Sequence, residues 1–221
     1  MKQLVISAGL VLLINFGVMA QINVRASNIQ DFTGKPIMNN AVSDLKGSFF
    51  YNDDYINAKM YLANGTELIN IKVKLNLRDN NVYYLNNDGS EMEAVSKVKR
   101  IVFMDKGIVF ENGFPAVNKQ DQQTYYRVII SGKASLLILT NFVESEYKEF
   151  NSAITTKQID KVNEIFGVSP NAIARLKKTD DVLQLLSDKN KEVYNYIITN
   201  NLKCKKQPDY ENVISYYNSL N

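Results

Sequence analysis

ELINIKVKLNLR, residues 67–78, decides the fold class, because apolar and polar residues alternate from Ile69 to Arg78. Successive side chains of an extended strand point to opposite faces, so alternation of this length is typical of a strand with one buried and one solvated face. Antiparallel sheets commonly have this pattern. The residues expected to face the core are Ile69, Ile71, Val73, Leu75 and Leu77, and those expected to face solvent are Asn70, Lys72, Lys74, Asn76 and Arg78.

Turn signals on both sides of this stretch predict further strands. Asn64-Gly65 predicts a type I′ turn, with positive φ at both residues, and therefore a hairpin that leads into residues 67–78. Other strands are expected where apolar runs are separated by Asn, Asp, Gly or Ser. These strands are 82–85, 98–103, 108–110, 125–131 and 135–142, the last of which contains a run, Leu136 to Leu139, that is apolar on both faces and suits a central strand.

Residues 157–178 allow two interpretations. Four apolar residues between 159 and 166 have helical spacing, whereas 167–171 has the composition of a turn between two short strands. We favour the hairpin.

The C-terminal part of the chain is predicted to be helical. Thr179 can cap a first helix, with Asp180 and Asp181 in its first turn, where the helix dipole favours anions. A second helix is expected from Ser187 and a third from Pro208. Strands followed by helices predict an α+β fold, with a largely antiparallel β-sheet body of about eight or nine strands and two to three short C-terminal helices.

Residues 1–20 have the composition of a signal peptide. Lys2 precedes an apolar run from Leu4 to Ala20, which is interrupted by Asn15 and is shorter than the roughly 20 residues that a membrane-spanning helix needs. Small residues before the Ala20–Gln21 bond suit signal peptidase. We expect cleavage between Ala20 and Gln21, with export and no transmembrane anchor afterwards. A retained anchor is the alternative.

The rest of the chain divides into three parts by its patterning. Residues 21–45 lack sustained periodicity and are expected to form a loosely ordered leader. Residues 46–176 are expected to form the antiparallel β body. Residues 177–221 are expected to form a helical segment packed on that body.

Composition excludes several kinds of chemistry. The chain has no histidine, which excludes Ser-His-Asp and Cys-His catalysis and zinc sites that use imidazole. The net charge of +3 is small, which argues against a nucleic-acid partner. Cys204, the single cysteine, cannot form an internal disulfide. The sequence has no nucleotide-binding motif and no metal-ligand spacing, so we expect no cofactor and no metal.

Two segments resemble a known group of proteins. They are LKGSFFYNDDYINAKMYLANGTELINIKVKLNLRDNNVYYLNNDGSEME, residues 45–93, and VYNYIITNNLKCKKQPDYENVISYYNSL, residues 193–220. Their order of aromatic pair, acidic pair, alternating strand, Asp-Gly turn and closing helix is similar to a family of small exported, signal-peptide-bearing proteins of Bacteroidota. The resemblance implies export, a β-rich body, a helical C-terminus and further strands in residues 157–178. It implies no activity and gives no residue a catalytic role.

Aromatic doublets are the main candidates for a binding surface. Phe50, Tyr51, Tyr83 and Tyr84 could together form an exposed aromatic surface that stacks on sugars or contacts a protein partner. The alternative is packing across strands and in the core, because neighbours on a strand face opposite sides. Acidic residues that could serve a carboxylate-dependent hydrolase are Asp53, Asp54, Glu144, Glu146 and Glu149.

These observations favour an exported, non-enzymatic binding or interaction protein of the bacterial cell envelope, with an envelope protein as its partner. A helical C-terminus differs from a β-rich sorting domain, so we favour the periplasm over the cell surface. One alternative is a periplasmic carrier of a lipid or other apolar ligand, which would need a cavity under the helices. Another is a hydrolase acting on glycans or peptides through paired carboxylates. The sequence leaves the oligomeric state open.

Overall fold

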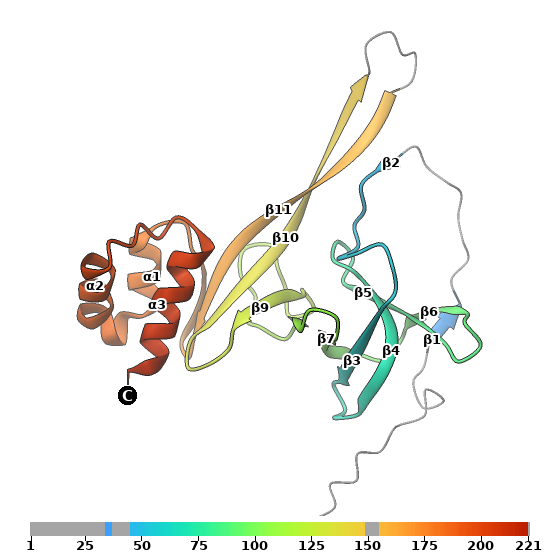
Figure 1. Ribbon diagram of the computed structural model, residues 1–221, viewed down its shortest axis with the longest axis horizontal. Coiled ribbons are helices and arrows are strands. Elements are labelled where there is room, and N and C mark those ends of the chain that lie inside the picture. The colour runs from blue at the N-terminus through green and yellow to red at the C-terminus, as the bar shows by residue number, and fades with distance from the viewer. Residues whose placement is uncertain (1–33, 37–44, 149–154, 221) are drawn as a thin grey trace, which may run out of the picture.

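The protein has the expected α+β class, with a large antiparallel sheet and helices at its C-terminal end (Figure 1). The computed structural model describes residues 34–36, 45–148 and 155–220. The signal segment and most of the leader therefore lie outside the described residues. The strands are β1 (Gly34–Pro36), β2 (Leu45–Lys46), β3 (Ile56–Leu62), β4 (Glu67–Asn76), β5 (Asn81–Leu85), β6 (Glu91–Ala94), β7 (Val98–Phe103), β8 (Ile108–Glu111), β9 (Tyr126–Ile130), β10 (Ser135–Lys148), β11 (Thr155–Ser169) and β12 (Ala172–Arg175).

Most strands pair with their neighbour in the chain, as the turn signals predict. The order across the sheet is β1-β6-β5-β4-β3-β7-β8-β9-β10-β11-β12, and β2 pairs with β11 in parallel. The twelve strands among the described residues exceed the expected eight or nine. The additional strands are β1, β2 and β6, which have two to four residues each, too few for an alternating pattern to be recognised.

A β-bulge corrects the predicted orientation of the start of β4. Ala58 pairs with Ile71 but Met60 pairs with Leu68, so Ile69 and Asn70 together oppose one residue of β3. Asn70 has φ +58°, a left-handed conformation that Asn tolerates better than most residues. The inserted residue reverses the alternation, so Leu68 is buried and Ile69 is exposed, contrary to the prediction.

Two other local predictions for β3 and β4 need correction. At the β3–β4 turn Gly65 has positive φ and Asn64 does not, so the turn is not type I′. The Gly65 N–H donates to the Leu62 carbonyl, so Gly65 is the last residue of a four-residue turn that begins at Leu62. Asn76, expected to face solvent, is buried. Its side-chain oxygen accepts hydrogen bonds from the N–H groups of Arg78 and Asp79 and shapes the following turn.

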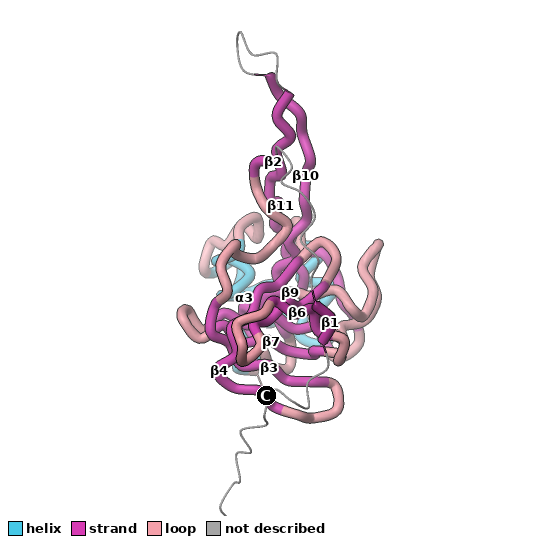
Figure 2. Tube along the Cα trace, turned by 90° about the vertical axis from the view of Figure 1, so that its right-hand side faces the viewer, coloured by secondary structure: helices cyan, strands magenta, loops and turns pink. Residues whose placement is uncertain are grey.

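The hairpin of β10 and β11 is the longest element of the sheet. Its strands have 14 and 15 residues and pair without interruption from Ser135–Val168 to Lys148–Thr155. The hairpin favoured for residues 157–178 is present and consists of the C-terminal part of β11 together with β12. The strand predicted to end at residue 142 is β10, which continues to Lys148. The far half of this hairpin projects beyond the body (Figures 1 and 2). Leu136 and Leu137 are both fully buried, as expected for a strand covered on both faces.

The helices cover one face of the sheet at β9 to β12 (Figure 1). They are α1 (Thr179–Leu185), the 3₁₀ helix η2 (Ser187–Lys189), α2 (Asn190–Thr199) and α3 (Gln207–Ser219). Thr179 is the first helical residue and not the cap that was predicted. Asp181 stabilises the start of the helix instead, because its carboxylate accepts hydrogen bonds from the backbone N–H groups of Lys177 and Lys178.

The apolar core lies in separate clusters along the sheet. One cluster joins β3, β4, β5, β7 and β8. A second joins the helices to β10, and a third lies on the opposite face of β10 and β11. Connections between strands beside the first cluster line a hollow, which is the candidate site.

Candidate functional site

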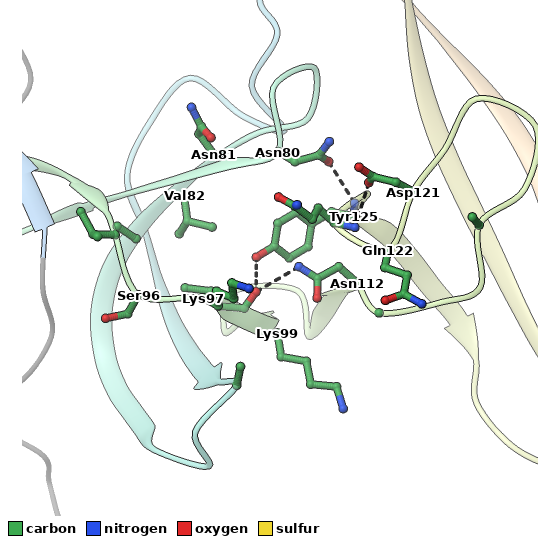
Figure 3. Close-up of a pocket in the computed structure, with 17 residues that line it drawn as sticks. Asn80, Asn81, Val82, Ser96, Lys97, Lys99, Asn112, Asp121, Gln122 and Tyr125 are labelled. Atoms are coloured by element: carbon green, nitrogen blue, oxygen red, sulfur yellow. Dashed lines mark hydrogen bonds between the residues drawn. The ribbon is translucent and has the colours of Figure 1, made fainter.

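Three connections enclose a pocket of about 750 Å³ (Figure 3). They are the turn into β5, the segment from β6 to β7 and the long connection from β8 to β9. The chain turns sharply at Asn80, with φ +57°, and at Gly113, with φ +92°. These left-handed positions explain why Asn and Gly occupy them.

Tyr125 forms the floor of the pocket and is held from both ends. Its backbone N–H donates to the Asn80 side-chain oxygen at 3.0 Å, and its hydroxyl donates to the Val98 carbonyl (Figure 3). Burial raises the pKa of Tyr125, so the phenol is a neutral group at physiological pH. Through Tyr125, the two hydrogen bonds link the turn before β5 and the start of β7 to the segment that leads into β9.

Asn112 forms one wall and shares an acceptor with Tyr125. Its side-chain amide donates to the Val98 carbonyl at 3.0 Å, and its backbone N–H donates to the Lys99 carbonyl at 3.1 Å. Gly113 then donates to the Gln122 carbonyl at 2.8 Å, which closes the long connection on itself. The wall is thus fixed before any ligand binds.

The charged groups of the pocket are two cations and one anion. Lys97 and Lys99 both line the pocket and are exposed; Lys99 is the extra residue of a β-bulge against β3, and its side chain lies beside Gly113. Asp121 is the carboxylate of the lining, and its oxygen accepts hydrogen bonds from Gln123 and Thr124 of its own turn. The uncharged polar side chains of the lining are Asn80, Asn81, Ser96, Asn112, Gln122, Gln123 and Tyr125.

The four aromatic residues predicted as one exposed surface are divided between two environments. Tyr84 is 2% exposed in the core of β5, which contradicts its place in an exposed surface. Tyr51 is half-buried against Phe103 and Phe110, with ring centroids 5.0 and 4.8 Å away. Tyr83 and Phe50, the neighbours of these two residues in the sequence, point to the opposite face, because successive side chains of an extended chain alternate between faces.

Phe50 and Tyr83 do meet on the outer face of the sheet. Their rings are edge to face with centroids 5.6 Å apart, and the Lys74 ammonium lies 4.5 Å from the centre of the Phe50 ring. The ammonium also lies 5.5 Å from the Tyr55 ring. Burial, followed by the nearby Glu91, raises the pKa of Tyr55 to about 12. This small cluster is a packed and half-buried surface, not an open stacking platform.

The acidic residues proposed for hydrolysis do not converge on the pocket. Glu144 and Glu146 lie on the projecting hairpin, where they pair with Arg78 at 3.5 Å and with Lys157 at 3.7 Å. Asp53 and Asp54 are exposed in the segment before β3. Glu149 lies outside the described residues. Within the described part of the chain, no group of three Cys, Asp or Glu side chains is arranged to hold a metal ion.

The space under the helices, where an apolar carrier would hold its ligand, is filled by side chains. Residues from all three α-helices are fully buried there. Cys204 lies in the same cluster, and burial raises the pKa of its thiol. The fully buried residues are Val182, Val193, Tyr210, Val213 and Ile214.

Sequence reasoning did not find the pocket. The lining comes from segments between residues 63 and 125 that only the tertiary structure brings together. The local signals were the turn at Asp79-Asn80-Asn81 and the dipeptide Asn112-Gly113, which also occur in ordinary hairpins.

Comparison with protein families, curated proteins and solved structures finds no match for this chain. No helix among the described residues is long and apolar enough to cross a membrane.

Proposed function

We propose that the protein is an exported, non-enzymatic binding protein of the bacterial cell envelope that holds an acidic, hydroxyl-rich ligand in the pocket over Tyr125. The observation that carries this proposal is the composition of the pocket: a fixed aromatic floor, walls of side-chain amides and two lysines at the edge. Such pockets combine an apolar surface with a few oriented polar groups that select the ligand. Export to the periplasm rests on the signal-like residues 1–20.

The charge of the pocket supports an acidic ligand. Lys97 and Lys99 bring two positive charges against the one negative charge of Asp121, whose Oδ1 accepts two hydrogen bonds within its own turn. Amide side chains can donate to and accept from hydroxyl groups in the same ligand. A sugar chain bearing carboxylates has this chemistry.

The same composition favours binding over hydrolysis. Glycoside hydrolysis by carboxylates needs two of them across the bond that is cleaved. The pocket lining has one carboxylate, that of Asp121, and therefore lacks the second one that this mechanism needs. A carrier of an apolar ligand would use the space under the helices, which is closely packed.

Titration calorimetry with oligogalacturonate, and with a neutral galactose oligosaccharide of the same length, tests the proposal. We expect the acidic oligosaccharide to bind and the Lys97→Gln/Lys99→Gln variant to weaken binding at least about tenfold, since each lost cation removes an interaction with the anion. The matched control is Lys72→Gln/Lys106→Gln, which makes the same charge change at exposed lysines outside the pocket.

Equal affinity in both double variants, or no binding of either oligosaccharide, would overturn the assigned ligand. Cleavage of the oligosaccharide during the titration would contradict a non-enzymatic role. Fractionation of the native host, with N-terminal sequencing of the recovered protein, tests export separately. The expected result is a periplasmic protein that begins at Gln21.

A further inference from the structure

The outer edge of β10 has no partner over most of its length. Among the described residues, β9 pairs with β10 only at Leu136, Leu137 and Ile138, and no strand pairs with that edge from Leu139 to Tyr147. Nine residues of strand span about 30 Å. Every second residue along this edge presents a backbone N–H and C=O that β11 does not use.

The opposite edge of the same hairpin, formed by β11, is paired at both ends. β11 is paired with β12 at Phe166 to Ser169 and with β2 at Lys157 and Gln158. Residues 139–147 of β10 contain no Pro, no Gly and no bulge, and the charged residues of this stretch are Glu144 and Glu146. The projecting part of β10 is therefore a regular strand that can accept another one (Figure 2).

We propose that the occupant of this edge is β10 of a second copy, paired antiparallel about a two-fold axis through Val143. Residues directly opposite each other in an antiparallel pair point to the same face of the sheet. A two-fold axis perpendicular to the sheet therefore places one residue opposite its own copy, with the axis midway between the two. Val143 is the midpoint of the open edge from Leu139 to Tyr147. Its side chain is 51% exposed, the most exposed apolar residue of β10.

The register centred on Val143 gives compatible neighbours on both faces. On one face Val143 meets its own copy, and Asn141 meets Ser145. On the other face Phe142 meets Glu144, and Thr140 meets Glu146. No like charges are directly opposite, which would weaken the pairing.

The adjacent registers are less favourable for reasons visible in the sequence and the sheet. An axis through Glu144 puts the two Glu144 carboxylates opposite each other, and an axis through Ser145 puts Glu144 opposite Glu146 twice. An axis at Phe142 pairs only Leu139 to Ser145 before it meets β9 at Ile138, two residues fewer than the register at Val143. Charge disfavours the registers at Glu144 and Ser145, and the longer paired edge favours Val143 over Phe142.

Association would also stabilise the projecting hairpin. A two-stranded hairpin is at best marginally stable by itself in water, whereas four strands support each other. The face of the hairpin that carries Val143 also carries Val162, which is 44% exposed and pairs with Asn141. This inference is independent of the pocket and of its ligand.

Disulfide trapping tests the register. In the proposed dimer the two Val143 Cα atoms lie about 5 Å apart, within the range of a disulfide. We expect Val143→Cys to form a covalent dimer under mild oxidation. Val162→Cys is the matched control, because its two copies would be separated by three strand spacings, about 14 Å, and also displaced along the strands, so this variant should form no cross-link. Cys204 is fully buried and does not interfere.

Charge substitution tests the interface without a cross-link. In sedimentation experiments we expect the wild type to be a dimer, Val143→Glu to be a monomer and Val162→Glu to remain a dimer. A mixture of Val143→Glu with Val143→Lys should recover the dimer, because the charges on the axis then attract. Circular dichroism checks that each variant is folded.

Three outcomes would overturn the proposal. The first is a wild type that sediments as a monomer at about 100 µM, where a micromolar interface would be filled. The second is equal cross-linking of Val143→Cys and Val162→Cys. The third is a dimer that persists in folded Val143→Glu, since the interface would then lie elsewhere. Oligosaccharide binding by Val143→Glu should be unchanged, so failure here is distinguishable from failure of the proposed function.

Discussion

Asn218 and Ala134 exchange two hydrogen bonds across 84 positions of the chain. The Ala134 N–H donates to the Asn218 side-chain oxygen at 2.7 Å, and the Asn218 side-chain nitrogen donates to the Ala134 carbonyl at 2.9 Å. The amide of Asn218 thus pairs with the backbone as a neighbouring strand would, and it ties the end of α3 to the start of β10.

Asn218→Ala should lower the free energy of unfolding by about 1–3 kcal/mol, because it leaves the backbone groups of fully buried Ala134 without partners. Urea unfolding measures the change. Asn212→Ala, an exposed position on the same helix, should change stability by less than about 0.5 kcal/mol. Equal effects at the two positions would show that helix propensity matters here and the paired bonds do not.

Tyr125 and Asn112 should be energetically coupled, since both donate to the Val98 carbonyl. Either Tyr125→Phe or Asn112→Ala leaves that carbonyl one donor, and each should cost about 0.5–1.5 kcal/mol. The double variant leaves it none, so its loss should exceed the sum of the two. A double-mutant cycle by urea unfolding measures the difference. Simple additivity would mean that water replaces the missing donors.

Asp188 should make stability depend on pH in acid. Burial acts to raise the pKa of this carboxyl, but the hydrogen bonds from Tyr217 and Lys133 oppose it and the net result is a pKa below the ordinary 3.8. A lowered folded-state pKa means that the contribution is complete above the ordinary value and is lost as pH falls through the lowered one. The group is about half exposed, so the effect should be small.

The pH dependence is measured as the difference in urea midpoint between wild type and Asp188→Asn, from about pH 6 to about pH 2. The difference should be constant down to about pH 4 and shrink below it. Asp180→Asn, at an exposed carboxylate on α1, serves as the control for general acid effects. A difference that grows as the pH falls would contradict the assigned sign.

Gly167 should not tolerate a side chain. It lies on β11 beneath α1, where an added Cβ would collide with a Leu185 methyl carbon and would meet a Leu176 methyl carbon at 3.1 Å. Gly167→Ala should therefore cost about 1–3 kcal/mol through overpacking. Thermal unfolding measures the cost, and Leu185→Ala in the same chain should relieve part of it. If the double variant is destabilised by the full sum of the two changes, the contact is not the cause.

The sequence by itself determined the local elements. Alternation in residues 71–77, the positions of the turns and the helical spacing of the last segments depend on neighbours within a few positions, so they predict an antiparallel sheet followed by helices. The hairpin after residue 157 was correctly favoured because the turn around 170 outweighed a helical spacing of only four residues.

Only the tertiary structure decided the features that depend on distant partners. The bulge at Asn70 turned Ile69 outward, because pairing with β3 and not local alternation sets the register there. Tyr84 entered the core and Tyr83 stayed outside, which sequence cannot distinguish until the buried face is known. The pocket over Tyr125 joins residues up to 62 positions apart. The alternating pattern predicts that a strand has an apolar and a polar face. Which distant residues contact each face and each edge depends on the packing of the whole chain.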